Sequence, residues 1–396
     1  MTPIPHGGGA AEAQRRYGLG NQPLIDFSAL VNPYGPSRSV IDAARASLER
    51  VHAFPEAGCP RLVERIAAWH GVPEDRVIVG AGTSELISLI GQSLREVLAL
   101  HAYENGDPAM AVSHLVEPSY GEYRRASVLN ELRIETWGSH VLRWRQDVFP
   151  QNAAGIFWTG HPDNPTGRAW DRETLLQGVD ASLGLLTVVD ESCLPFFPDE
   201  EERTLVPAAA QRENLLVLRS FSHVAAIPGL RIGYAVTSPD MVVRLKQYQS
   251  PWSVTSVAEA AALAALEDVD SYLESARRLT NETPRLAERL SSLPWLRPVW
   301  PERKRPVDAP PLAHFLLVSL SETAWTSVQV HEALARRGFL VRECSDFRGL
   351  EVGALLTGHD QLVATQGHLR ITARTPSEND RLIAALTEVF SAEPPR

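Results

Sequence analysis

The chain has 396 residues, which is longer than one ordinary domain and predicts a large domain joined to a smaller one. Hydrophobic residues make up 44% of the chain and charged residues 22%, which excludes disordered, collagen-like and membrane proteins. A formal net charge of -10 at pH 7 argues against nonspecific binding to nucleic acid or to anionic lipid, because both would be repelled.

Cysteine usage and the first residues bear on the cellular compartment. Cys59, Cys193 and Cys344 show neither a pairing pattern nor a metal-binding spacing, which favours a reducing compartment. Residues 1–9 lack a basic segment followed by an apolar run, and no uninterrupted stretch of about 18 apolar residues occurs. We therefore expect a cytoplasmic protein without a bound metal, a membrane partner or a nucleic-acid partner.

Short apolar runs alternate with amphipathic stretches between residues 40 and 285, the large domain of the predicted α/β fold. This alternation is typical of a mostly parallel sheet flanked by helices. The predicted strands are residues 77–80, 110–114, 155–160, 185–190, 215–221 and 233–237. The predicted helices include residues 84–98, 172–179, 256–267 and 271–290.

The last part of the chain, residues 286–396, has the pattern of a smaller α+β domain. Its predicted strands are residues 314–320 and 368–373, and its predicted helices are residues 327–337 and 377–390. Residues 301–311 are rich in proline and predict a loop. Residues 1–39, rich in glycine and proline, are expected to pack on this smaller domain.

Polar residues follow the predicted strands at the edge where α/β sheets place their ligands. Gly82, Thr83 and Ser84 open a helix and offer N–H groups and hydroxyls to an anion, although they also fit a plain helix cap. Tyr120 follows a proline and suits either stacking on a planar ring or packing in the core. Asn164 lies in His-Pro-Asp-Asn-Pro-Thr-Gly, which is also a turn sequence.

Two further strand ends carry charged or ionisable groups. Asp190 ends an apolar strand, where a buried carboxylate needs a partner such as a protonated pyridine nitrogen. Ser220, Ser222 and His223 end the next strand, and Arg231 follows eight residues after His223. Serines and an arginine that converge in this way suit a phosphate group.

Together these five places resemble the fold-type I enzymes that depend on pyridoxal phosphate (PLP), and the resemblance covers essentially the whole chain. It implies that Tyr120 stacks on the cofactor ring, that Asn164 bonds its phenolic oxygen, and that Asp190 keeps its ring nitrogen protonated. It also implies that Arg370, in Leu-Arg-Ile-Thr, holds the α-carboxylate of a substrate. The implied phosphate ligands are Gly82, Thr83, Ser84, Ser220, Ser222 and Arg231.

Within this family the chain resembles the threonine-phosphate decarboxylase branch, beside the histidinol-phosphate aminotransferases. The motifs that carry the likeness are His6-Gly7-Gly8, Asp26-Phe27-Ser28 with Asn32-Pro33-Tyr34-Gly35, residues 342–350, and residues 369–374 with Glu378-Asn379-Asp380. The likeness implies that His6, Asn32 and Arg342 bind a phosphate or second anion on the substrate. For His6, a disordered terminus is the alternative.

The resemblance breaks at the position where the family carries the lysine that links the cofactor. The family motif is Ser-x-Ser-Lys, whereas this chain has Ser-Phe-Ser followed by His223, and imidazole cannot form the Schiff base. The only lysines, Lys246 and Lys304, lie in no suitable motif, so we expect PLP or pyridoxamine phosphate (PMP) to bind noncovalently. The pyridoxamine-dependent sugar 3-dehydratases of the same superfamily also have histidine at this position.

Three smaller departures accompany this replacement. Phe54 stands where the family has a tyrosine that reaches the cofactor phosphate of a partner subunit, which implies a homodimer. Cys193 replaces an aromatic residue three positions after Asp190. An insertion at residues 351–367 precedes Arg370 and is expected to reshape or cover the substrate pocket.

The sequence leaves three hypotheses open. In the first, the protein is an enzyme that uses His223 as acid and base on a small amino acid, by decarboxylation, elimination, dehydration or half-transamination. In the second, it is a catalytically silent relative that binds a ligand or a protein through the old pocket. In the third, His223 is a laboratory substitution of the lysine of an ordinary decarboxylase or aminotransferase.

Overall fold

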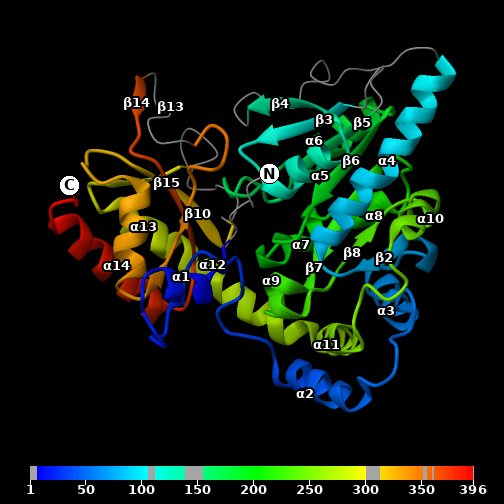
Figure 1. The fold of residues 1–396 in the computed structure, drawn as a ribbon, viewed down its shortest axis with the longest axis horizontal. Helices are drawn as coiled ribbons and strands as arrows, with labels where there is room; N and C mark the ends of the chain where they lie inside the picture. The colour runs from blue at the N-terminus through cyan, green and yellow to red at the C-terminus, as the bar shows by residue number, and fades with distance from the viewer. Residues whose placement is uncertain are drawn as a thin grey trace.

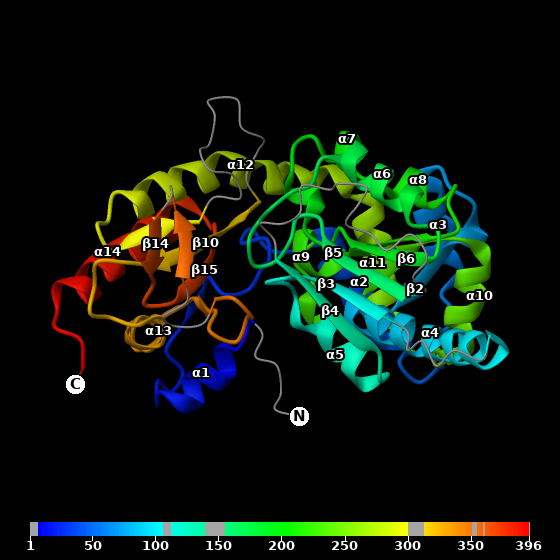
Figure 2. The same ribbon diagram turned by 90° about the horizontal axis from the view of Figure 1, so that it is seen from above.

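The computed structural model describes residues 7–105, 112–138, 155–299, 313–350, 355–358 and 361–395. Figures 1 and 2 show two lobes, a large one around a broad sheet and a smaller one around a second sheet. Within the described ranges the large sheet has seven strands and the main sheet of the smaller lobe has four. No helix in these ranges combines the length and the apolar character needed to cross a bilayer.

The large sheet has the strand order β2-β8-β7-β6-β5-β3-β4. Strand β8 runs antiparallel to both of its neighbours, and the other described pairings are parallel. The strands are β2 (Val77–Gly80), β3 (Val112–Glu117), β4 (Arg133–Gly138), β5 (Gly155–Gly160), β6 (Leu185–Asp190), β7 (Leu215–Ser220) and β8 (Gly233–Val236). The parallel strands end at the same edge, which lies toward the small lobe.

Both faces of the large sheet are buried, which explains why its strands are continuous apolar runs. Successive side chains alternate between faces. Along β7, Leu215 and Val217 join one hydrophobic cluster, whereas Leu216 and Leu218 join the cluster on the other face.

Helices cover the two faces of this sheet. One face packs against α4 (Thr83–Asn105), α5 (Gly121–Leu129) and α10 (Pro239–Tyr248). The other packs against α2 (Arg38–Ser47), α3 (Pro60–His70), α6 (Arg172–Ala181) and α11 (Ser256–Glu267). Short helices α7 (Glu200–Arg203), α8 (Val206–Ala209) and α9 (Phe221–Val224) follow strand ends.

The small lobe is built on an antiparallel sheet with the order β12-β15-β10-β9. Its strands are β9 (Leu296–Pro298), β10 (Phe315–Leu320), β12 (Arg342–Glu343) and β15 (His368–Thr372), and its helices are α13 (Ser327–Ala335) and α14 (Pro376–Ser391). A separate hairpin joins β13 (Leu355–Gly358) to β14 (Gln361–Ala364) within the insertion, most of whose other residues lie outside the described ranges.

The N-terminal segment lies against the small lobe. Strand β1 (Ile25–Asp26) pairs in parallel with β11 (Phe339–Leu340), and helix α1 (Ala10–Arg16) places Ala13 against Ala335 and Leu340. Residues 26–32 then cross to the large lobe, where the backbone N–H of Asn32 donates to the carbonyl of His223 at 3.0 Å. This crossing segment, residues 26–32, is called the strap below.

Helix α12 (Val269–Ser291) connects the two lobes (Figures 1 and 2). Its first half contributes Tyr272 and Leu279 to a core cluster of the large lobe, and its second half contributes Leu286 and Leu290 to the core of the small lobe. The helix therefore passes from the core of the large lobe to the core of the small lobe near residue 285. The domain limits at 39 and 285 stay a prediction.

A buried ion network fixes the ends of β6 and β7. Arg219, only 2% exposed, donates at 3.0 Å to Glu191, which is fully buried, and it also pairs with Glu200. Glu191 accepts further hydrogen bonds from the Thr204 hydroxyl at 2.6 Å and from the Leu205 N–H at 2.7 Å. The network holds in place the backbone that directly follows Asp190 and directly precedes Ser220.

We expect Arg219→Met to lower the apparent free energy of unfolding by about 3–5 kcal/mol, because it leaves the buried carboxylate of Glu191 without its counter-ion. Urea denaturation followed by circular dichroism measures this loss. The matched control is Arg212→Met, which breaks a more exposed pair with Asp180 and is expected to cost at most about 1 kcal/mol. Equal losses in the two variants would contradict this role of the network.

Candidate active site

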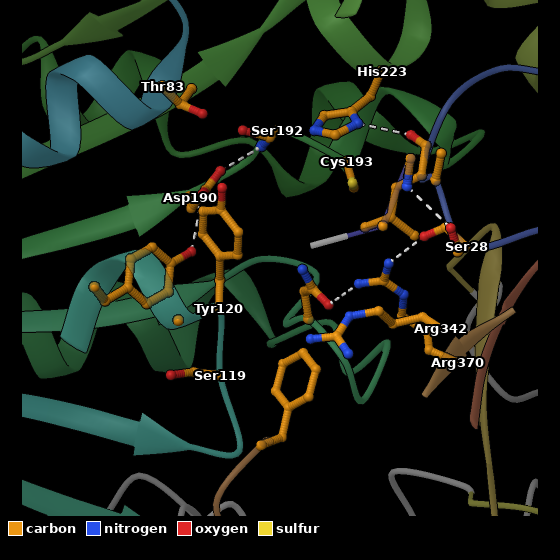
Figure 3. Close-up of a pocket in the computed structure, with 18 of the residues that line it drawn as sticks. Ser28, Thr83, Ser119, Tyr120, Asp190, Ser192, Cys193, His223, Arg342 and Arg370 are labelled. Carbon is orange, nitrogen blue, oxygen red and sulfur yellow. Dashed lines mark hydrogen bonds between the residues drawn. The ribbon is translucent and has the colours of Figure 1, made fainter. Parts of the chain in front are cut away.

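A cavity of about 910 Å³ lies where the carboxyl ends of the large sheet face the small lobe. Figure 3 shows side chains from both lobes directed into it. The structure brings seven of the predicted site residues together in its lining, namely Thr83, Tyr120, Asn164, Asp190, His223, Arg342 and Arg370.

One end of the cavity is suited to an anion. Thr83 begins the 23-residue helix α4, whose first N–H groups and dipole favour negative charge. Gly82 precedes it with φ at +82°, and a Cβ at this position would overlap a guanidinium nitrogen of Arg231. Gly233 on β8 lies directly behind, where a Cβ would come within 3.0 Å of the Thr83 nitrogen. The turn therefore leaves room for Arg231 beside the helix start.

Asp190 is held at the end of β6 with only 9% of its surface exposed. One carboxylate oxygen accepts from the Tyr123 hydroxyl at 2.9 Å, and the other accepts from the Ser192 N–H at 2.9 Å. Tyr123 is buried, stacks on Trp158, and contacts the ring of Tyr120 edge-on with centroids 5.6 Å apart. Each carboxylate oxygen keeps a second lone pair, so Asp190 can still accept a cationic N–H from the cavity.

Tyr120 lies on the same wall of the cavity (Figure 3). Its hydroxyl hydrogen-bonds Ser84, and burial raises its pKa above the ordinary value, so the phenol stays neutral. Its ring is positioned beside Asp190, where it can contact the face of a planar ligand.

Arg370 connects the small lobe to the opposite wall. Its guanidinium, 4% exposed, donates to the side-chain oxygen of Asn164 and, at 2.6 Å, to the carbonyl of Ser28. Burial lowers the pKa of Arg370 to about 10, so it remains charged at neutral pH, and its Nε has no hydrogen-bond partner among the described residues. Arg370 is therefore able to receive an anionic ligand.

The turn that carries Asn164 is stabilised from behind by Asp163. This buried carboxylate accepts from the Thr166 hydroxyl at 2.9 Å, and the Asp163 carbonyl accepts from the Gly167 N–H at 2.7 Å. Burial raises the pKa of Asp163 to about 7.

His223 lies at the start of the segment after β7 and is partly buried. Its Nδ1 is 2.7 Å from the carbonyl oxygen of Leu30, and its other ring nitrogen points toward the side of the cavity where Ser192 and Asp190 lie (Figure 3). Burial is the main cause that lowers the pKa of His223 below its ordinary value, and the positive charges of Arg370 and Arg231 act in the same direction. The ring is therefore neutral at pH 7.

Arg342 lies beside Arg370, because their residues pair across β12 and β15. Its guanidinium donates to Asp346 at 2.7 Å and to the carbonyl of Glu343, and it covers the ring of Phe347. Two arginines on one wall favour a ligand with more than one negative group.

The other predicted residues lie outside the cavity lining. Ser220 accepts from the Ser222 N–H at 3.1 Å as a helix cap. Asn32 donates its amide to the Val224 carbonyl at 3.0 Å and to the Ser275 hydroxyl at 2.6 Å, so its amide is used within the protein. His6 falls outside the described residues. Gly82, Ser84, Ser222 and Arg231 lie behind or beside residues that line the cavity.

Several groups that line or support the cavity were missed in the sequence. Tyr120 is the N-cap of α5 and Tyr123 lies in the first turn of that helix, so an aromatic residue shortly after the predicted Glu-Pro-Ser-Tyr turn was the available signal. The Ser28 and Leu30 carbonyls left no signal, because every residue carries such a group. Cys193, which the sequence analysis noted as a departure from the family, lines the cavity, and burial raises the pKa of its thiol, so it is not activated as a nucleophile.

The model of the family described as aminotransferase class I and II matches residues 22–386. This chain belongs to that family. It is 28% identical over 400 residues to the threonine-phosphate decarboxylase of Salmonella typhimurium, and this alignment covers 98% of each chain. It is 31% identical to the histidinol-phosphate aminotransferase of Symbiobacterium thermophilum, and this alignment covers 98% of this chain and 95% of the relative.

A solved structure supports the same fold. The histidinol-phosphate aminotransferase from Sinorhizobium meliloti, in complex with pyridoxal-5'-phosphate, superposes with a TM-score of 0.77 at 20% identity, over 98% of this chain and 96% of the other. The α/β architecture of this class I and II family member is thus the fold-type I architecture of PLP-dependent enzymes, and the predicted fold class is confirmed.

We expect Gly82→Ala to weaken the binding of PLP at least about tenfold, because the new methyl group displaces the Arg231 guanidinium from a charged hydrogen-bonding position. Titration of cofactor absorbance or protein fluorescence measures the dissociation constant. The matched control is Gly71→Ala. Gly71 also has a positive φ, +65°, but an added Cβ there would meet open space, so this variant carries the same backbone strain without displacing a side chain. Unchanged affinity in Gly82→Ala would place the phosphate elsewhere.

Proposed function

We propose that the protein is an enzyme that binds PLP or PMP noncovalently and uses His223 to move a proton at or near Cα of a small amino acid. The proposed substrates include phosphorylated amino acids. The proposed setting is a cytoplasmic homodimer.

The observation that supports this proposal most strongly is the position of His223 in the lining of the cavity. It faces the cavity between Asp190 and Arg370, at the position that follows β7, and no lysine lines the cavity among the described residues. Lys246 is exposed on α10, and Lys304 lies outside the described residues. A covalent link to a cofactor in this cavity thus has no amine to form it in the described part of the chain.

The residues present fit a pyridoxal cofactor. The start of α4 and the Arg231 guanidinium, which occupies the space that a Cβ on Gly82 would fill, suit the phosphate, and the carboxylate of Asp190 suits a protonated ring nitrogen. Tyr120 and Asn164 would contact the ring and its phenolic oxygen. When bound, the cofactor supplies an electron-withdrawing ring that stabilises negative charge developing at Cα.

His223 then supplies the acid and base chemistry. A lysine amine titrates near ~10.4 and imidazole near ~6.5, so freeing a lysine base at pH 7 costs roughly 4.6 kcal/mol that imidazole does not require. Burial lowers the pKa of His223 further, which keeps the ring in its basic form. The same ring can return the proton, because a group that accepts a proton as a base can donate it again as an acid.

The arginines of β12 and β15 would orient the substrate. Arg370 would bind the α-carboxylate, since its charge is only partly compensated by the neutral partners Asn164 and Ser28. Arg342, beside it, would bind a second anion such as a phosphate, and the exposed Arg348 lies in the same lining. This arrangement supports phosphorylated amino acids as the substrate class.

The homodimer is proposed from an exposed aromatic pair. Phe54 is 81% exposed and Trp252 is 52% exposed, and their rings contact each other at 4.9 Å. Large apolar groups gathered at one place on a surface favour a protein interface.

The test is exchange of the Cα hydrogen for deuterium in D₂O, followed by proton NMR with PLP, because only the aldehyde form of the cofactor can condense with an amine. The amines to screen are L-threonine O-3-phosphate, L-histidinol phosphate and the unphosphorylated L-threonine. We expect exchange with at least one amine and a loss of about 10²–10⁴-fold in His223→Gln, the usual contribution of a general base. His331→Gln, on α13 and outside the cavity lining, is the control and should exchange at the native rate.

The outcomes separate the three hypotheses. Cofactor binding without exchange of any amine would contradict the catalytic role and favour a silent binding protein. Full decarboxylase or aminotransferase activity in His223→Lys, with none in the native chain, would favour a natural protein with lysine at this position.

A further inference from the structure

The strap holds His223 by both its backbone and its side chain. The carbonyl of His223 accepts from the N–H of Asn32 at 3.0 Å, and its Nδ1 lies 2.7 Å from the carbonyl of Leu30. Asn32 in turn donates its side-chain amide to the Val224 carbonyl at 3.0 Å. These contacts join residues about 190 positions apart in the chain, so they depend on how the strap crosses between the lobes.

The contact with Leu30 determines which ring nitrogen carries the proton. A carbonyl oxygen can only accept a hydrogen bond, so Nδ1 of His223 must be the donor. In a neutral imidazole the other nitrogen, Nε2, then has a free lone pair. Figure 3 shows that this second nitrogen is the one that faces the cavity.

The surroundings of His223 agree with a neutral ring. The charged or titratable groups near it are Asp190 on β6, Arg370 on β15, Arg231 after the Pro228–Leu230 turn, and His314 just before β10. Two of these groups are cationic and one is anionic, and His314 is buried and uncharged because burial lowers its pKa well below the ordinary value. A second proton on the ring of His223 is therefore disfavoured.

The strap itself is shaped by Asp26. One carboxylate oxygen of Asp26 accepts from the Ser28 N–H at 2.8 Å, from the Ser28 hydroxyl at 2.6 Å and from the Ala29 N–H at 3.1 Å. The resulting turn directs the Ser28 carbonyl to Arg370 at 2.6 Å, two residues before the carbonyl that reaches His223. The same short segment thus positions the base and the carboxylate-binding arginine.

We propose that the strap, organised by Asp26, fixes His223 as the Nδ1–H tautomer, so that Nε2 is the proton acceptor that faces the substrate. Asp26 is then a positioning residue: it acts on the reaction through Leu30 and His223. This inference rests on the proposed role of His223 as base, but the tautomer itself is a property of the protein without any cofactor.

The test is proton–nitrogen NMR of the protein labelled with ¹⁵N-histidine, because protonated and unprotonated ring nitrogens have well-separated nitrogen shifts. The signals of His223, one of 12 histidines, are assigned by their loss in His223→Gln. We expect a protonated Nδ1 and an unprotonated Nε2. His331 is an internal reference, because its Nδ1 lies 2.9 Å from the Val341 carbonyl and should show the same pattern. A protonated Nε2 at His223 would overturn the proposal.

The role of the strap is tested in Asp26→Ala, which removes the acceptor of three hydrogen bonds. We expect the His223 signals to shift toward a mixture of the two tautomers, and we expect Asp26→Asn, whose amide oxygen can accept the same bonds, to restore the native pattern. Asp180→Ala, which removes an exposed acceptor of Arg212, is the control and should leave His223 unchanged.

An unchanged Nδ1–H tautomer in folded Asp26→Ala would overturn the role of Asp26. The native spectrum decides the tautomer even if Asp26→Ala does not fold. Failure of cofactor binding or of deuterium exchange would refute the proposed enzyme without changing this spectrum, so the two failures can be told apart.

Discussion

The site depends on one buried charge, the guanidinium of Arg370. Taking such a charge out of water costs several kcal/mol, and among the described residues this cost is offset by hydrogen bonds to the large lobe and to the strap rather than by a carboxylate. Asn164 comes from the large lobe, the Ser28 carbonyl comes from the strap, and Arg370 itself belongs to the small lobe. The same contacts that stabilise the charge therefore join the three segments that form the cavity, and they leave the positive charge available to a carboxylate ligand.

A histidine after β7 changes what this architecture can do. A lysine at that place would provide both a covalent link and a base, whereas imidazole provides the base alone. The chain retains the other elements of the site, including the acid at the end of β6 and the start of α4, whose N–H groups favour negative charge. In the proposed function, affinity for the cofactor comes from its phosphate end and from Asp190, and the close packing of Gly82, Arg231 and Gly233 would position Arg231 for that phosphate.

Sequence reasoning located the elements best where the apolar pattern was continuous. Strands β5 and β6 and helix α11 have the predicted bounds. The two strands are buried runs bounded by glycine or by Asp190, and the helix begins after Thr255, whose side chain caps it. Strand β3 was predicted at residues 110–114 but spans residues 112–117. The prediction ended at His114 as a polar residue, yet this side chain is buried and accepts a hydrogen bond from the indole N–H of Trp137 at 3.2 Å.

The site was predictable to the extent that side chains mark it. Asp190 was found because a carboxylate at the end of an apolar strand is rare, whereas Arg370 was indicated by the resemblance to the PLP-dependent family. Asn32 was expected to contact the substrate, but its amide is bonded to Val224 and to Ser275, a residue 243 positions away that no local pattern could indicate. The Leu30 carbonyl that holds His223 was equally invisible, because its position depends on the tertiary path of the strap.

The most direct test of the account is an absorbance titration of the purified protein with PLP, and separately with PMP, before and after borohydride reduction. A noncovalent site predicts a cofactor band that saturates, is lost on dialysis, and leaves no added mass on the reduced protein. A stable pyridoxyl adduct on Lys246 or Lys304, or the absence of binding at millimolar concentrations of both cofactors, would contradict a noncovalent site served by His223.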